Sequence, residues 1–173
     1  MCLISFISCQ DKASPFGVNE LTLKQKYYNG NQIKLNGYWY KPNSGNSPSR
    51  QVYFLYRNGV IQGGIGVLDS ELLTKEEEFR NGIYYSKTKE SEIYWGLFEI
   101  NDKSIVFEKW YPESSYSSPT AVREGEIIND TTFLITQTYR YRRGKKVEVT
   151  KTNETYHFKE LSPKPDSTNK YIK

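Results

Sequence analysis

The sequence predicts a mainly β protein: a single antiparallel up-and-down β-barrel of about 8–10 strands with one short helix in mid-chain. Its 173 residues suit one domain. Fifteen tyrosines, eight phenylalanines and three tryptophans favour strands over helices. Short strand-like runs joined by tight turns also make neighbours in sequence neighbours in space. Because so long an antiparallel sheet must bury one face and protect its edges, we expect it to close.

The first strands are predicted between residues 31 and 68. Apolar and polar residues alternate over residues 31–42, and residues 43–49 have the composition of a loop. Residues 50–68 contain two strand runs around Asn58-Gly59, a strong hairpin signal. The glycines of Gly63–Gly66 predict a bulge or a sharp strand bend, because no Lys-Ser/Thr pair follows to make a phosphate loop.

One helix is predicted, within residues 68–82. Asp69 or Ser70 can cap its start, and Asn81-Gly82 ends it. Consecutive helical residues point in different directions, so Glu76–Glu78 is expected to face solvent. Three apolar side chains are expected to hold the helix against the body: Leu72, Leu73 and Phe79.

The remaining strand signals again come as runs separated by short turns. The runs are residues 83–88, 92–100, 104–112, 121–129, 132–141 and 146–161, with turns at Asn101–Lys103, Asp130-Thr131 and Arg143-Gly144.

Gly37-Tyr38-Trp39 resembles the Gly-x-Trp motif at the first barrel strand of the lipocalin superfamily. The resemblance implies a lipocalin-like barrel whose bottom is closed by Trp39, covered by a basic residue from the last strands. Arg140, Arg142 and Lys159 are the candidates. The mid-chain helix and the missing C-terminal helix depart from that family's plan. The whole chain also resembles small lipocalin-like lipoproteins of Bacteroidetes, which implies a fold and a location but no activity.

The opening residues suggest export and anchoring. Phe6-Ile7-Ser8-Cys9 resembles a bacterial lipobox, which implies lipid attachment at Cys9. The division predicted is a signal-peptide remnant over 1–9, a flexible tether over 10–18, the barrel domain over 19–161 and a C-terminal tail over 162–173. The alternative is that residues 2–7 form a short buried strand. The resemblance to a lipobox implies a location outside the cytoplasm, in the cell envelope, with a lipid anchor in the outer membrane.

The sequence contains few of the residues that commonly carry catalysis or bind metals. Both cysteines lie in the first nine residues, which excludes a disulfide framework or a thiolate metal site in the body. The one histidine, His157, is predicted to lie in the barrel wall or on the surface. We therefore expect no catalytic residue, no metal and no cofactor. A hydrolase using carboxylates such as Glu92, Glu99 and Glu108 is a weaker alternative.

Charge gives no sign of a nucleic-acid partner. Lysine and arginine total 24 against 20 aspartates and glutamates, a net charge of +4. The most basic stretch, Tyr139–Lys146, interleaves aromatic and cationic residues, a pattern also typical of single-stranded nucleic-acid binding. A hairpin tip kept soluble by its charges explains the same stretch more simply.

Two functions remain open. The first is a binding module with an aromatic-lined cavity for a small apolar or amphipathic ligand. The second is a filled barrel that binds an envelope protein partner through the helix and the loop at 110–120. A cavity favours the first, and contiguous exposed aromatic residues favour the second. The expected ligand-binding residues are Trp39, Phe54, Trp95, Phe98, Phe107 and Trp110.

Overall fold

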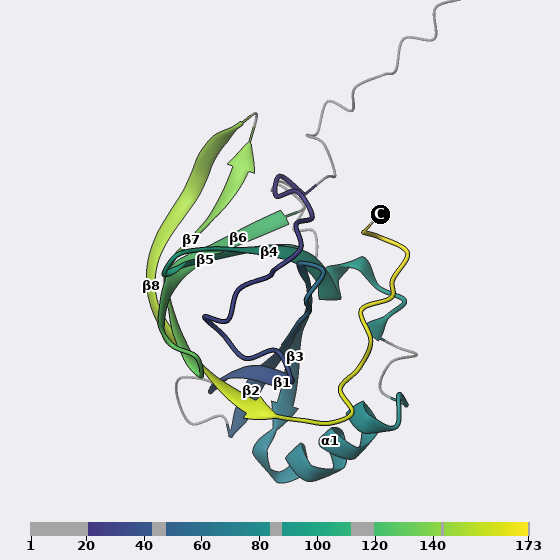
Figure 1. The fold of residues 1–173 in the computed structure, drawn as a ribbon. Coiled ribbons are helices and arrows are strands. Elements are labelled where there is room, and N and C mark those ends of the chain that lie inside the picture. Colours follow the sequence, from purple (N-terminus) through teal and green to yellow (C-terminus); the bar gives the residue numbers. More distant parts are fainter. Residues whose placement is uncertain (1–20, 43–47, 84–87, 112–119, 143, 173) are drawn as a thin grey trace, which may run out of the picture.

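The described residues form one closed, eight-stranded antiparallel up-and-down β-barrel with one short α-helix among its described elements, as the sequence predicted (Figure 1). The structure, a computed structural model, describes residues 21–42, 48–83, 88–111, 120–142 and 144–172. Each strand pairs with the next, and β8 pairs with β1 to close the barrel. The strands are β1 (Gly37–Pro42), β2 (Ser49–Leu55), β3 (Val60–Leu68), β4 (Trp95–Asn101), β5 (Ser104–Trp110), β6 (Thr120–Asn129), β7 (Thr132–Arg142) and β8 (Lys145–Glu160).

The two ends of the barrel differ in how they are covered. The β2–β3, β4–β5 and β6–β7 turns lie at one end, together with the start of β1. Residues 28–36 cross this closed end (purple in Figure 1), where the Tyr28 N–H donates to the Arg57 carbonyl at 2.8 Å and the Lys34 N–H to that of Asp130 at 3.0 Å. The β1–β2, β3–β4, β5–β6 and β7–β8 connections leave from the opposite end, which we call the mouth.

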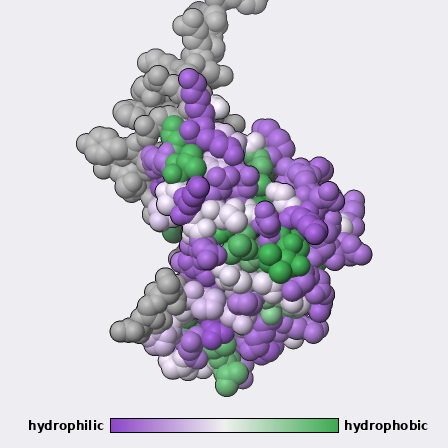
Figure 2. Space-filling view, turned by 90° about the vertical axis from the view of Figure 1, so that its left-hand side faces the viewer, coloured by the Kyte–Doolittle hydropathy of each residue, from purple (hydrophilic) through white to green (hydrophobic). Residues whose placement is uncertain are grey.

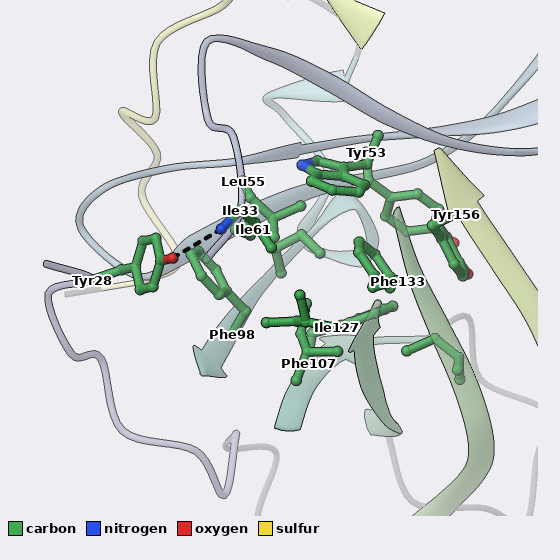
Figure 3. Packing of buried hydrophobic residues seen from close by; sticks show 13 residues of the cluster. Tyr28, Ile33, Tyr53, Leu55, Ile61, Phe98, Phe107, Ile127, Phe133 and Tyr156 are labelled. Atoms are coloured by element: carbon green, nitrogen blue, oxygen red, sulfur yellow. Dashed lines mark hydrogen bonds between the residues drawn. The ribbon is translucent and has the colours of Figure 1, made fainter. Parts of the chain in front are cut away.

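The interior near the closed end is filled by aromatic and branched side chains (Figure 3). Phe133 stacks on Tyr156 with ring centroids 4.7 Å apart, and Phe98 lies 5.9 Å from Tyr28. This interior cluster consists of Tyr28, Ile33, Trp39, Tyr53, Leu55, Ile61, Phe98, Ile105, Phe107, Ile127, Phe133, Ile135 and Tyr156.

Trp39 is fully buried in this cluster, and its neighbours differ from those that the lipocalin resemblance implied. Its ring lies 4.7 Å from Phe133 and 5.5 Å from Phe158, and its indole N–H donates to the Lys34 carbonyl at 3.1 Å. The expected basic cover is wrong for two of the three candidates: Arg140 pairs with Glu148 and Lys159 with Glu76. The side chain of the third, Arg142, lies outside the described residues.

A second buried cluster lies outside the barrel wall, over β1 to β4. The helix α1 (Leu72–Arg80), entered through a 3₁₀ turn at Asp69–Glu71, packs there, with Phe79 5.3 Å from Phe54. Residues 161–172 run along the same side (yellow in Figure 1). The outer cluster consists of Tyr38, Val52, Phe54, Tyr56, Val60, Ile65, Val67, Phe79, Trp95, Leu97 and Leu161.

Three expectations about the helix are wrong. Neither Asp69 nor Ser70 caps its start, because both lie in the preceding 3₁₀ turn and α1 begins after Glu71 without a side-chain cap. Leu73 is 76% exposed, whereas Leu72 and Phe79 pack on the outer cluster as expected. Glu76 is 4% exposed rather than solvated, because its carboxylate accepts a hydrogen bond from the Tyr38 hydroxyl at 2.6 Å and pairs with Lys159 at 2.6 Å. A carboxylate can be buried here because a cation and a hydroxyl meet it.

Further expectations concern the ends and connections of the chain. The proposed strand at 83–88 falls mostly on residues 84–87, outside the described residues, as do Cys9, the tether and most of the 110–120 loop. The tail packs on the barrel: Pro165 is buried and Tyr171 lies 6.4 Å from Trp110, ring to ring.

Candidate functional site

A pocket of about 310 Å³ opens at the mouth, where β3 and β4 separate. The two strands pair only through Val60–Gln62 of β3 and Trp95–Leu97 of β4. Beyond Gln62, β3 has no partner in β4, because β4 begins at Trp95 and the residues before it form a 3₁₀ turn, Glu92–Tyr94. The space between is walled by β2, β5 and β6. The lining residues are Gln51, Tyr53, Gly63, Gly64, Ile93, Tyr94, Phe107, Lys109, Trp110, Tyr111, Ala121 and Arg123.

A bulge in β3 shapes one wall of this mouth pocket. The β2–β3 register shifts between Val52 and Tyr53, opposite Gly63 and Gly64, whose φ angles are 147° and 85°. Only glycine adopts such angles without strain. A Cβ on Gly64 would lie 2.9 Å from the Lys109 Nζ. The bulge predicted at Gly63–Gly66 is therefore confirmed, and it gives the lysine its space.

Lys109 is the central polar group of the pocket. Its stem crosses Gly96 of β4, where a Cβ would lie 2.6 Å from the lysine Cγ. Its ammonium donates to the Gly63 carbonyl and lies 5.5 Å from the centroid of the Tyr53 ring. Burial, and secondarily the charge of Arg123, lower the pKa of Lys109 to about 7. No carboxylate among the described residues forms an ion pair with it.

Glu154 compensates the other cations of the mouth. It pairs with Lys41 at 2.9 Å and with Arg123, and it accepts a hydrogen bond from the Tyr156 hydroxyl at 3.3 Å. Burial opposes its ionisation, but the Lys41 hydrogen bond and the Arg123 charge hold its pKa below the ordinary value. The Lys41–Glu154 pair also bridges the strands above Tyr40, where β1 no longer pairs with β8.

The described interior charges of the mouth are therefore unbalanced. Lys41, Lys109 and Arg123 face one carboxylate, Glu154. Burial raises the pKa of the Tyr53 and Tyr156 phenols, so both stay neutral at neutral pH. The imbalance centres on Lys109, since Lys41 and Arg123 share Glu154.

The six aromatic residues expected to line one cavity fall into three places. Trp39, Phe98 and Phe107 belong to the interior cluster, and Phe107 also lines the pocket. Trp110 lines the pocket as well but packs against the outer cluster and the Tyr171 ring. Phe54 and Trp95 lie in the outer cluster, so the expectation of a shared cavity is wrong for these two. The reason is the alternation of strands: Phe54 follows the inward Tyr53 and must face outward.

Sequence reasoning missed the polar residues of the pocket. Lys109 stands two positions after Phe107, so the same alternation that turns Phe107 inward turns the lysine inward. A cation at an inward position of a predicted strand was the available signal. No such signal marks Arg123, because polar and apolar residues do not alternate regularly along its strand and its inward position cannot be recognised from the sequence.

The other candidate features have structural partners. Glu108 is fully buried on the outside of β5, where it accepts hydrogen bonds from the Thr22 and Leu23 N–H groups at 2.7 and 2.9 Å and from the Thr120 hydroxyl at 2.7 Å. Glu99 pairs with Lys26 at 3.1 Å beside a hollow of about 260 Å³ at the closed end. These two carboxylates hold the N-terminal segment on the barrel.

The basic stretch Tyr139–Lys146 forms the β7–β8 hairpin tip, as predicted. Tyr139 is buried rather than presented as a stacking platform, and Lys146 lies 4.0 Å from its ring centroid and 3.1 Å from a Glu124 oxygen. Figure 2 shows the side of the barrel that carries β8 as mostly hydrophilic, with separate hydrophobic patches. The contacts favour a solvated hairpin.

Comparison with known proteins leaves the site to be judged on its geometry. No protein-family model, curated protein or solved structure matches the chain. Within the described residues, none of the helices combines the length and apolar character needed to cross a membrane.

Proposed function

We propose that the protein is a lipid-anchored, extracytoplasmic lipoprotein whose lipocalin-like barrel binds one small amphipathic ligand in the mouth pocket. The observation that carries the proposal is the pocket itself. Its lining includes the aromatic residues Phe107, Trp110 and Tyr111, of which Trp110 also packs on the outer cluster, and the cationic residues Lys109 and Arg123. Apolar walls with few convergent polar groups are typical of small-molecule sites.

The size and position of the pocket limit the ligand. Its volume of about 310 Å³ is near the lower end of the range for ligand sites. The interior cluster fills the barrel below it, and Tyr53, Phe107 and Tyr156 form the boundary, with Tyr53 and Phe107 rings 5.8 Å apart. The ligand is therefore small and sits at the mouth rather than along the barrel axis.

Native mass spectrometry tests the binding function. A soluble form spanning residues 10–173, exposed to an envelope lipid extract, is expected to retain a defined adduct that leaves on denaturation. Ala121→Trp places a large ring in the pocket and should abolish the adduct. Ile128→Trp adds the same ring at a position that is 59% exposed and should leave the adduct unchanged. Equal retention by both variants would contradict the mouth site.

The anchor is tested separately, through the two cysteines. Cys9→Ala should abolish incorporation of labelled palmitate and release the protein from the membrane fraction. Cys2→Ala is the matched control, because Cys2 lies outside the lipobox and should leave labelling intact. Labelling that survives Cys9→Ala would contradict the anchor.

A filled barrel that binds an envelope protein is the second candidate. The observation that favours it is the packed closed end, together with the exposed apolar residues Leu73, Ile83 and Tyr111. A clean unliganded mass after exposure to the extract would favour this candidate over ligand binding.

A further inference from the structure

We infer that the ligand carries an anionic group, of the carboxylate class, which binds the ammonium of Lys109 in the mouth pocket. This inference rests on the proposed function, because it names the chemistry of the ligand for that same site. It goes beyond that function in assigning recognition of the ligand's negative charge to Lys109.

The first step is the arrangement of charge. Of the inward cations at the mouth, Lys41 and Arg123 share Glu154. Lys109 of β5, on the strand next to that of Arg123, has a backbone carbonyl as its acceptor instead. Burying a cation without a counterion is unfavourable. A ligand anion would supply the missing charge in a site of low dielectric, where such a pair is stronger than in water.

The second step is access. Lys109 is half-buried and lines the pocket, so its side chain borders both the protein and the open space. The Gly63 carbonyl uses one N–H of the ammonium, which has further donors to offer. Tyr94, Trp110 and Tyr111 are among the residues that line the same space and can contact an apolar ligand body, although Tyr94 and Trp110 also pack on the outer cluster.

The third step is a coupling between binding and protonation. The groups around the ammonium are Arg123 on β6, Tyr53 on β2, Tyr94 of the 3₁₀ turn and, across the mouth, Lys41 on β1 with Glu154 and Tyr156 on β8. Burial and the Arg123 charge place the pKa of Lys109 at about 7, so the amine is largely neutral at pH 8. A bound anion favours the charged form and raises that pKa. Binding at pH 8 should therefore take up a proton, whereas binding at pH 6 should not.

Isothermal titration calorimetry with octanoate and octan-1-ol tests the inference, since the two probes share a chain and differ in charge. The protein should bind octanoate more tightly than octan-1-ol by about tenfold or more, the effect of one charged hydrogen bond. At pH 8 the octanoate enthalpy should depend on the ionisation enthalpy of the buffer, which reports proton uptake.

Lys109→Met should remove both the octanoate preference and the proton uptake, while octan-1-ol still binds. Lys109→Gln provides a second neutral variant if the first fails to fold. Lys151→Met is the matched control, because it removes one positive charge from an exposed position on β8 and should change neither readout.

The outcomes separate the inference from the proposed function. Equal affinity for the two probes, or an octanoate preference that survives both Lys109 variants, would overturn the inference and leave the binding module standing. Failure of both probes together with an unliganded mass from the extract would overturn the proposed function and the inference with it.

Discussion

The closed end and the mouth of the barrel are built from the same strands, yet their interiors differ in chemistry. On β5 the inward Phe107 is followed, two residues on, by Lys109. On β8 the inward Tyr156 lies two residues from Glu154, and on β1 Trp39 lies two residues from Lys41. In each strand the apolar member faces the closed end and the charged member faces the mouth.

The comparison shows that one strand pattern serves two purposes. At the closed end, stacked rings exclude water and supply the stability of the barrel. At the mouth, the same inward positions hold cations whose burial opposes folding. Groups that lower stability at a pocket and have no structural necessity indicate function.

The largest predicted loss of stability comes from a substitution at the closed end. Trp39→Ala should lower the free energy of unfolding by about 3–5 kcal/mol, because it removes a fully buried ring that contacts Phe133 and Phe158. Trp110→Ala is the matched variant at the mouth. It should cost about 1 kcal/mol, since Trp110 is half-buried and packs on the Tyr171 ring. Urea denaturation measures both, and equal losses would contradict the division between the two ends.

The next largest loss of stability is expected from removing the charge of Glu154, which balances Lys41 and Arg123 at the mouth. Glu154→Gln leaves Lys41 and Arg123 without their shared carboxylate and should cost about 3 kcal/mol at pH 7. The pKa of Glu154 is lowered in the folded protein, so its contribution is complete above the ordinary value of 4.5 and is lost as the pH falls through the folded pKa. The difference between the two proteins should therefore shrink in acid. A difference independent of pH would mean that the amide disrupts packing rather than charge.

The sequence predicted the fold more fully than the site, and particular residues show why. Asn58-Gly59 and Asn101–Lys103 are local turn signals, and both form the predicted hairpins. The pocket depends instead on where β3 and β4 stop pairing, which no local signal reports. Residue type alone predicts Phe54 and Trp95 in the cavity, whereas the side of the sheet that each faces depends on the register of the strands. Glu76 looked solvated because its partners, Tyr38 and Lys159, are distant in the sequence.

The smallest predicted effect concerns the unbalanced lysine, and its sign distinguishes the mouth from the closed end. Lys109→Met should stabilise the protein at pH 6 by about 1–2 kcal/mol, because it removes a half-buried charge that has no ion-pair partner among the described residues, while the lost hydrogen bond to Gly63 offsets part of the gain. The folded pKa is about 7 and the ordinary value 10.5, so the unfolded chain binds more protons between these limits. The stability of the native protein therefore rises with pH across that window, and the advantage of the variant should disappear by about pH 10. Lys164, whose pKa burial lowers to about 8, is present in both proteins, so its contribution cancels in the difference. Urea denaturation at pH 6, 8 and 10 measures the gap. A difference in free energy of unfolding that stays constant with pH would show that the charge of Lys109 is already compensated in the folded protein. The mouth would then hold no unbalanced charge, and in this respect it would not differ from the closed end.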